Sequence, residues 1–226
     1  MLAYGFFVLN IVVLALVALL IHRYSPRFGL FNLLLFLSAL VALMSFSTPW
    51  LIIIEPSPGI VMTIPWDILL PVILQVILVL YVADGTLVAQ RSIYGVAGIN
   101  LLVLGALVVM NTFINLSDSS VPLAFEPRQF FVGSLVFVVD MFVIAIVYQG
   151  VINAFPGVSR WFLPGLALLV ALWTDGVMFH LLTVADTAEF ARLLPGDILI
   201  KTVAGIILWF PTSFYLNRIA AKSPEF

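Results

Sequence analysis

Five ionisable residues lie inside apolar stretches in the second half of the chain: Asp140, Asp175, His180, Asp197 and Lys201. A charged group in apolar surroundings is costly unless it is paired, and such groups often mark ligand or ion sites. Asp197 and Lys201 are four residues apart, so on a helix they share one face, with the acid first, which is the favourable order. Lys201 can also be neutralised by Asp140 or by Asp175. The spacing therefore predicts a paired, buried cluster with room for a polar ligand.

Each of these residues also has a structural explanation. Pro195 and Gly196 precede Asp197, which therefore suits an N-cap or first-turn position of a helix that Lys201 follows one turn later. Trp173 stands two residues before Asp175, and an aromatic ring beside a carboxylate suits either a flat, nitrogen-bearing ligand or ordinary packing. We predict a ligand-binding set that comprises Asp140, Asp175, Lys201, Trp173, His180 and Asp197.

The remaining polar residues within apolar stretches favour structural roles. Asp84 is expected to pair with Arg91 or to cap a helix break at Gly85. The amides are expected to form hydrogen bonds between helices. They are Asn10, Gln75, Asn100, Asn111 and Gln149.

The sequence contains none of the motifs that usually carry catalysis. It has no nucleophile elbow, phosphate-binding loop or metal-binding helix motif. It has no Cys and only two His, which excludes thiolate sites and disfavours a histidine-based metal site. We therefore expect a protein that is not an enzyme and that uses no metal and no cofactor. The formal charge of −2, with basic residues scattered, excludes a nucleic-acid partner.

Composition indicates which elements position these residues. Of the 226 residues, 64% are hydrophobic and only 9% are charged, which excludes both a soluble domain and a disordered chain. Seven apolar runs approach the length of about 20 residues that crosses a bilayer. They are Leu2–Ile21, Leu30–Phe46, Trp66–Val88, Val96–Phe113, Phe130–Ile152, Trp161–Leu182 and Gly196–Tyr215. The expected fold is an all-α integral membrane protein with seven transmembrane helices, a single polytopic domain over 1–217 and a short tail over 218–226.

The basic residues predict the orientation of the bundle. One side of it receives six of the nine: Arg23, Arg27, Arg91, Arg160, Arg218 and Lys222. The other side receives two, Arg128 and Arg192. Since Lys and Arg gather in cytoplasmic loops, we expect the N-terminus outside and the C-terminus cytoplasmic, in a multi-pass protein of the plasma (inner) membrane. The ionisable cluster then lies in the outer half, and the loop Ser47–Pro65 lies at the outer interface.

Spacings in the last third of the chain resemble the vitamin-uptake transporter family, whose studied members import queuosine precursors. That family places an Asp fourteen positions after a Trp, as Trp161 and Asp175 do here, and carries Asp-x3-Lys-x9-Pro in its last helix, as Asp197, Lys201 and Pro211 do. The family typically has six spans. In the segment that corresponds to the one around Asp84, it also has a charged residue one turn after its Asp. This chain has an additional N-terminal span, and Val88 stands at that position.

In the features in which it differs from the transporters, the chain resembles the vitamin-uptake-like sensor domain, a seven-helix relative of that family. The segments 81–95 and 208–215 resemble that domain. The resemblance implies a domain that typically precedes cytoplasmic signalling modules in prokaryotes, so the cytoplasmic C-terminus would suit attachment of such a module, whether the chain is an excised domain or a stand-alone version.

Three functions agree with this sequence. The first is a sensor in which a small molecule enters from outside, between the fifth, sixth and seventh helices; the bilayer and a signalling module or second copy are its other partners. The second is a transporter of a vitamin- or purine-like solute that uses the same residues. The third is a retinal protein, because Asp197-x3-Lys201 resembles microbial rhodopsins. Against the third, Lys201 is expected only one turn from the helix mouth, and the Trp-x2-Tyr-Pro of rhodopsins is absent.

Overall fold

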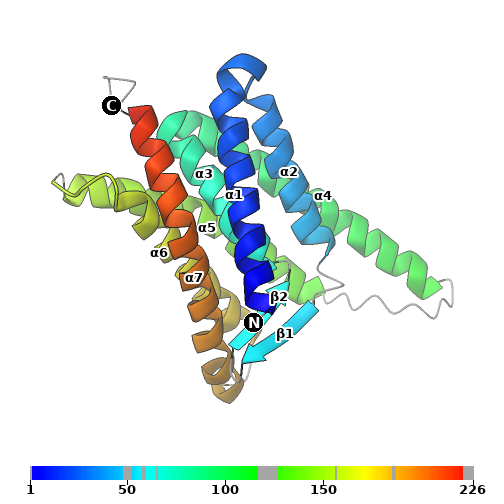
Figure 1. Ribbon diagram of the computed structural model, residues 1–226. Helices are drawn as coiled ribbons and strands as arrows, with labels where there is room; N and C mark the ends of the chain where they lie inside the picture. The colour runs from blue at the N-terminus through cyan, green and yellow to red at the C-terminus, as the bar shows by residue number, and fades with distance from the viewer. Residues whose placement is uncertain are drawn as a thin grey trace.

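The computed structural model describes residues 2–47, 52–57, 60–64, 66–116, 127–155, 157–184 and 187–220. Seven helices and two strands account for most of them. Their bounds are α1 Leu2–Phe28, α2 Phe31–Phe46, β1 Ile52–Ser57, β2 Ile60–Ile64, α3 Trp66–Ala83, α4 Thr86–Leu116, α5 Pro127–Ala154, α6 Leu163–Thr183 and α7 Thr187–Ala220. The helices run alternately up and down, and the two termini lie at opposite ends of the bundle (Figure 1). We call the end of the bundle at which α1 begins its N-terminal end, and the end at which α7 finishes its C-terminal end.

Helix α3 forms the centre of the bundle. It contacts each of the other six helices, and every residue from Asp67 to Leu80 is buried. Its sequence is apolar on all sides, which is typical of a helix surrounded by other helices. Gln75 is the polar exception in its middle, and its Nε2 donates to Thr212 Oγ1 of α7 at 2.9 Å.

Six helices are long and apolar enough to cross a membrane, namely all except α2. Helix α2 is apolar but has only 16 residues, which is below the usual span length. The predicted helical membrane bundle is therefore confirmed. Of the seven spans that we predict, six meet the length criterion.

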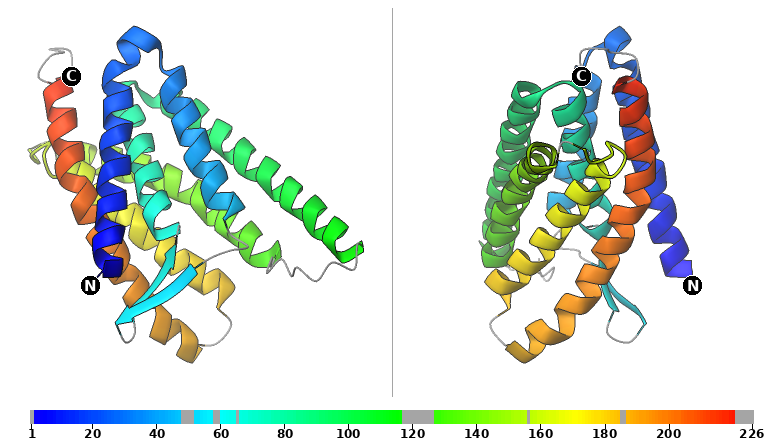
Figure 2. Two further views of the ribbon diagram at one scale, coloured as in Figure 1. Left: turned by 45° about the vertical axis from the view of Figure 1, so that its right-hand side comes forward. Right: turned by 90° about the vertical axis from the view of Figure 1, so that its left-hand side faces the viewer.

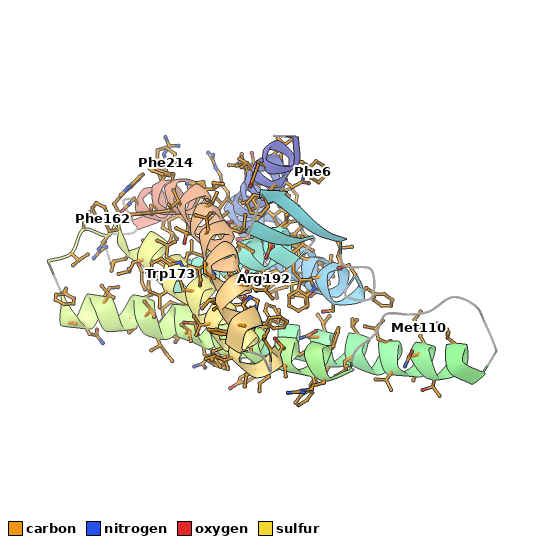
Figure 3. All side chains as sticks on the ribbon, turned by 90° about the horizontal axis from the view of Figure 1, so that it is seen from below. Phe6, Met110, Phe162, Trp173, Arg192 and Phe214 are labelled. Carbon is orange, nitrogen blue, oxygen red and sulfur yellow. The ribbon has the colours of Figure 1, made fainter. Side chains whose placement is uncertain are left out.

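The outside of the bundle is apolar. Phe6, Phe162 and Phe214 project from it with more than half of their surface exposed (Figure 3). The second half of α4 extends beyond the packed helices and carries exposed side chains such as Met110 (Figures 1 and 3). In water such a surface would be unfavourable, but against lipid tails it carries no penalty.

A short β-hairpin replaces part of the expected interfacial loop, so the fold is not purely helical. Strands β1 and β2 are antiparallel, with Ile52 opposite Ile64, and the register shifts between Ile54 and Ser57. Strand β2 contacts α3 and α7, and the hairpin lies at the N-terminal end of the bundle (Figure 2). The β-branched residues on both sides of Pro58-Gly59 explain it, since they favour strands and the pair favours a turn.

Several predicted helix boundaries are wrong. Helix α3 ends at Ala83 and α4 begins at Thr86, because Gly85 takes a positive φ of 93° that breaks the helix earlier than expected. Helix α7 begins at Thr187 and runs through Pro195 and Gly196 without a break. It continues to Ala220, so the segment expected to start a tail at 218 is still helical; the rest of that tail lies outside the described residues.

Candidate functional site

Helices α6 and α7 approach each other closely because glycines face the contact. A side chain at Gly165 would overlap the indole ring of Trp209, and a Cβ at Gly205 would lie 2.6 Å from Leu169 Cδ2. At Gly176, a Cβ would lie 2.7 Å from Asp197 Oδ2 and 3.3 Å from Lys201 Nζ. Small residues of this kind allow two helix backbones to pack tightly in a membrane. They bring the polar side chains of α7 against the backbone of α6.

Lys201 is the centre of the buried ionic cluster. Its Nζ lies 2.6 Å from Asp175 Oδ2 on α6 and 2.6 Å from Asp197 Oδ2 on its own helix. Asp197 Oδ2 also lies 3.3 Å from His180 Nε2. Lys201 is only 5% exposed. An ammonium this deeply buried depends on its two carboxylates, because water cannot replace them.

Two further carboxyl groups surround this cluster. Asp140 of α5 is completely buried and interacts electrostatically with Asp175 and Lys201. Asp67, in the first turn of α3, adds a further negative charge to the surroundings of Lys201. Four carboxyl groups therefore face one lysine and one histidine. The neutrality of this region requires bound protons or a ligand that brings positive charge, and hydrogen-bond donors on such a ligand would further stabilise the carboxylates.

Buried polar atoms without a hydrogen-bond partner concentrate in the same region. Among the described residues they are Trp66 Nε1, Gln75 Oε1, both carboxyl oxygens of Asp140 and His180 Nδ1. All except Gln75 Oε1 belong to this end of the bundle. Trp66 packs on α5 at Gly133, seven residues and two turns before Asp140, with Phe179 beside it. Native proteins leave few buried polar atoms unbonded, and those that remain often belong to functional sites.

The structure places the six predicted ligand-binding residues in two groups. Asp140, Asp175, His180, Asp197 and Lys201 gather in the cluster, whereas Trp173 lies outside it. Trp173 is 41% exposed, and its Nε1 donates to Thr202 Oγ1 at 2.9 Å. Its ring therefore lies partly exposed beside α7 and not inside the cluster. Two residues of α3 that the sequence does not single out, Asp67 and Trp66, lie at the same end of the bundle as the cluster.

Asp197 is not a helix cap, and Lys201 is not near a helix mouth. Helix α7 begins ten residues before Asp197 and fourteen before Lys201. The expectation failed because Pro195-Gly196 reads as a helix break. In a membrane, neighbouring helices can compensate for the hydrogen bond that a proline removes. Lys201 therefore lies well inside its helix, and its depth does not count against a retinal protein.

Asp84 forms a second polar cluster at the opposite end of the bundle, and its predicted pairing with Arg91 is wrong. Its Oδ2 lies 2.8 Å from His22 Nε2, and His22 Nδ1 lies 2.5 Å from the Tyr215 hydroxyl. This chain of contacts joins α1, the end of α3 and the last turns of α7. Arg91 lies inside α4, because that helix begins earlier than expected.

Three of the predicted amide roles are confirmed. Gln75 bonds to Thr212, Ser45 donates to Asn100 at 2.8 Å, and Tyr81 donates to Gln149 at 3.1 Å, each between different helices. Asn10 instead donates to Phe6 O in its own helix. Within the described ranges, no group of three or more His, Cys, Asp or Glu side chains is arranged so that it could hold a metal ion.

Gly176→Ala should disrupt the cluster without replacing any of its polar side chains. The new methyl would force Asp197 Oδ2 away from its place 2.6 Å from Lys201 Nζ. We expect a loss of about 1–3 kcal/mol in unfolding free energy, the usual cost of overpacking. Unfolding the protein with increasing dodecyl sulfate in mixed micelles measures this change in unfolding free energy. Gly150→Ala on α5 is the matched control, because nothing lies within 4 Å of a Cβ there; an equal loss in the control would refute this explanation.

Comparison with known proteins gives one match. No curated protein and no solved structure matches the chain. A model of the family described as vitamin uptake-like sensor matches residues 14–216. That range includes α2 to α6 entirely, most of α1 and α7, and both polar clusters. The chain belongs to the vitamin uptake-like sensor family.

Proposed function

We propose that this membrane sensor domain binds a small, nitrogen-bearing molecule at the Lys201 cluster and reports it through α7. The observation that carries the proposal is Asp140, which is completely buried and whose carboxyl oxygens meet no N–H donor among the described residues; their hydrogen-bonding neighbour is the carboxyl group of Asp175. A ligand with N–H donors would satisfy these oxygens. His180 Nδ1 and Trp66 Nε1 offer further unsatisfied polar atoms at the same end of the bundle.

The charge of this region supports a ligand of that chemistry. The four carboxyl groups exceed the nearby positive charges, so an amino-substituted or protonated heterocycle would be attracted and an anion repelled. The rings of Phe179 and His180, whose centroids are 5.9 Å apart, offer apolar surface beside the acids. Pterins, deazapurines and nucleobases share this combination of a flat ring and several donors.

We infer that the cluster faces the outside of the cell. Five arginines lie toward the other end of the bundle: Arg23, Arg27, Arg91, Arg160 and Arg218. Arg192 and Arg128 lie toward the end that carries the cluster and the hairpin. The arginine-rich end suits the cytoplasm. A signalling module or a second copy of the chain would then receive the signal from α7 at that end.

A transporter remains the alternative, with the same cluster as its substrate site. Transport needs a polar route to the cytoplasmic end. The Gln75–Thr212 pair lies between the two polar clusters, but buried apolar residues such as Val76, Val79 and Leu208 surround it. This packing favours the sensor.

The test is a thermal-stability screen of the purified protein in detergent. The panel contains pterins, deazapurines, flavins, nucleobases and retinal. A compound that binds only the folded protein at about 100 times its Kd should add about 2.7 kcal/mol of stability. The shift should disappear in Asp140→Asn and Asp175→Asn.

Asp84→Asn is the matched control, since it makes the same chemical change at the other end of the bundle. It should respond like the wild type. A shift that survives both cluster substitutions, or no shift with any compound, would count against the site. Uptake of a stabilising compound into proteoliposomes would favour the transporter, and binding without uptake would favour the sensor.

A further inference from the structure

A cavity lies at the opposite end of the bundle from the Lys201 cluster. Its volume is about 370 Å³, and it lies between the C-terminal ends of α3, α5 and α7 and the beginning of α6. This volume is within the range of about 300–1,000 Å³ that is typical of small-molecule sites. Its lining includes Tyr81, Tyr148, Gln149, Arg160, Leu163 and Asn217.

The lining combines one cation, two amides and an apolar wall. The rings of Tyr81 and Tyr148 meet edge to face with centroids 6.1 Å apart, and the Tyr81 hydroxyl donates to Gln149 Oε1. Leu163 and Ile152 add aliphatic surface. Arg160 lies on the segment between α5 and α6 and interacts electrostatically with Tyr148. Guanidinium and amide groups beside apolar surface suit a phosphate attached to an apolar body.

The segment that carries Arg160 is held against α7. The carbonyl oxygen of Trp161 accepts a hydrogen bond from Trp209 Nε1 at 2.9 Å and another from Ser213 Oγ at 2.7 Å. Both donors belong to α7, which also contributes Asn217 to the cavity. The backbone beside Arg160 is therefore held against the helix that carries Asn217, which keeps the arginine and the amide at the same cavity.

The charge around the cavity favours an anion. The five arginines named above lie toward this end of the bundle. Among the residues that the structure describes, Asp84 is the only acid there, and it is paired with His22 at 2.8 Å. Basic cavities between membrane helices near the cytoplasmic surface are well suited to anionic phospholipid headgroups.

We propose that this cavity binds an anionic organic phosphate, held by Arg160 with Gln149 and Asn217, whose apolar part packs on Tyr148 and Leu163. The ligand is either the headgroup region of an anionic phospholipid or a soluble phosphate ester; the two share this chemistry. The site is independent of the Lys201 cluster and of what binds there.

Thermal unfolding of the purified full chain tests the proposal. The three probes are dioleoyl phosphatidylglycerol, dioleoyl phosphatidylcholine, which has the same acyl chains but no net charge, and glycerol 3-phosphate. We expect phosphatidylglycerol to raise the Tm by about 4 °C at roughly ten times its Kd, and phosphatidylcholine to have no effect. A matching response to glycerol 3-phosphate would identify the soluble ester as the ligand, and its absence would identify the lipid.

Arg160→Gln should lose the response, and the lipid-free variant should still fold, because Arg160 is exposed and lies outside the helices. Arg218→Gln is the control. It removes the same charge at the same end, but its guanidinium lies 4.2 Å from the centroid of the Phe214 ring and does not line the cavity. Equal responses to the two lipids, equal losses in the two variants, or no response to any probe would overturn the proposal.

Discussion

Lys201→Met should destabilise the protein more than any other single substitution in the polar clusters. It removes the ammonium that lies 2.6 Å from both Asp175 and Asp197 and leaves these carboxyl groups buried together with Asp140. Breaking a buried ion pair from one side costs about 3–5 kcal/mol. Titration of unfolding with dodecyl sulfate from mixed micelles measures the change in free energy.

A double-mutant cycle separates the ion pair from simple packing. Asp175→Asn alone should cost less than Lys201→Met, because Lys201 keeps Asp197 at 2.6 Å. The double variant Asp175→Asn with Lys201→Met should be more stable than the sum of the single changes predicts, by about 1–3 kcal/mol. Strict additivity would show that the lysine and this aspartate do not depend on each other.

Asp140→Leu should stabilise the protein, whereas Lys201→Met destabilises it. The same Asp140→Leu substitution should nevertheless abolish ligand binding. The substitution replaces a completely buried carboxyl group, which meets no N–H donor among the described residues and faces the like-charged carboxyl group of Asp175, by an apolar side chain of similar size. Removing such a group should raise the free energy of unfolding by about 1–3 kcal/mol. At the same time, the thermal shift caused by a cluster ligand should disappear.

Gln75→Leu provides the comparison for this prediction. Gln75 is also buried with an unbonded Oε1, but its Nε2 donates to Thr212 at 2.9 Å. Its replacement should therefore cost about 1 kcal/mol rather than stabilise the protein, and ligand binding should remain. A destabilised Asp140→Leu would mean that the carboxyl group is structural, and an unchanged ligand response would remove it from the site.

The class of fold and the pairing within α7 were predictable because they depend on local sequence. Apolar runs identify membrane helices by length and composition alone. Asp197 and Lys201 are one helical turn apart, so their ion pair follows from helix geometry. The hairpin was also present in the sequence, as β-branched residues around Pro58-Gly59, but the apolar character of this segment led to its interpretation as an interfacial loop.

The contacts between distant segments could not be predicted in the same way. His22 and Asp84 are separated by 62 positions, and their contact depends on how α1 is rotated against α3. In a membrane protein, apolar periodicity does not fix this rotation, because lipid and neighbouring helices are equally apolar. The same reason explains why Trp173 was expected inside the bundle, although it lies on the outer face of α6.

Because α7 is continuous, it can transmit a movement at the Lys201 cluster to the C-terminal end of the bundle. Its 34 residues, at about 1.5 Å each, give a rod of about 50 Å, which is longer than the hydrocarbon core of about 30 Å. Lys201 holds the helix near its middle and Tyr215 holds it near its C-terminal end. The last turn lies about 25 Å beyond the lysine, so a tilt of about 5° there would move it by about 2 Å. A small rearrangement of carboxylates thus becomes a displacement that a neighbouring protein can detect.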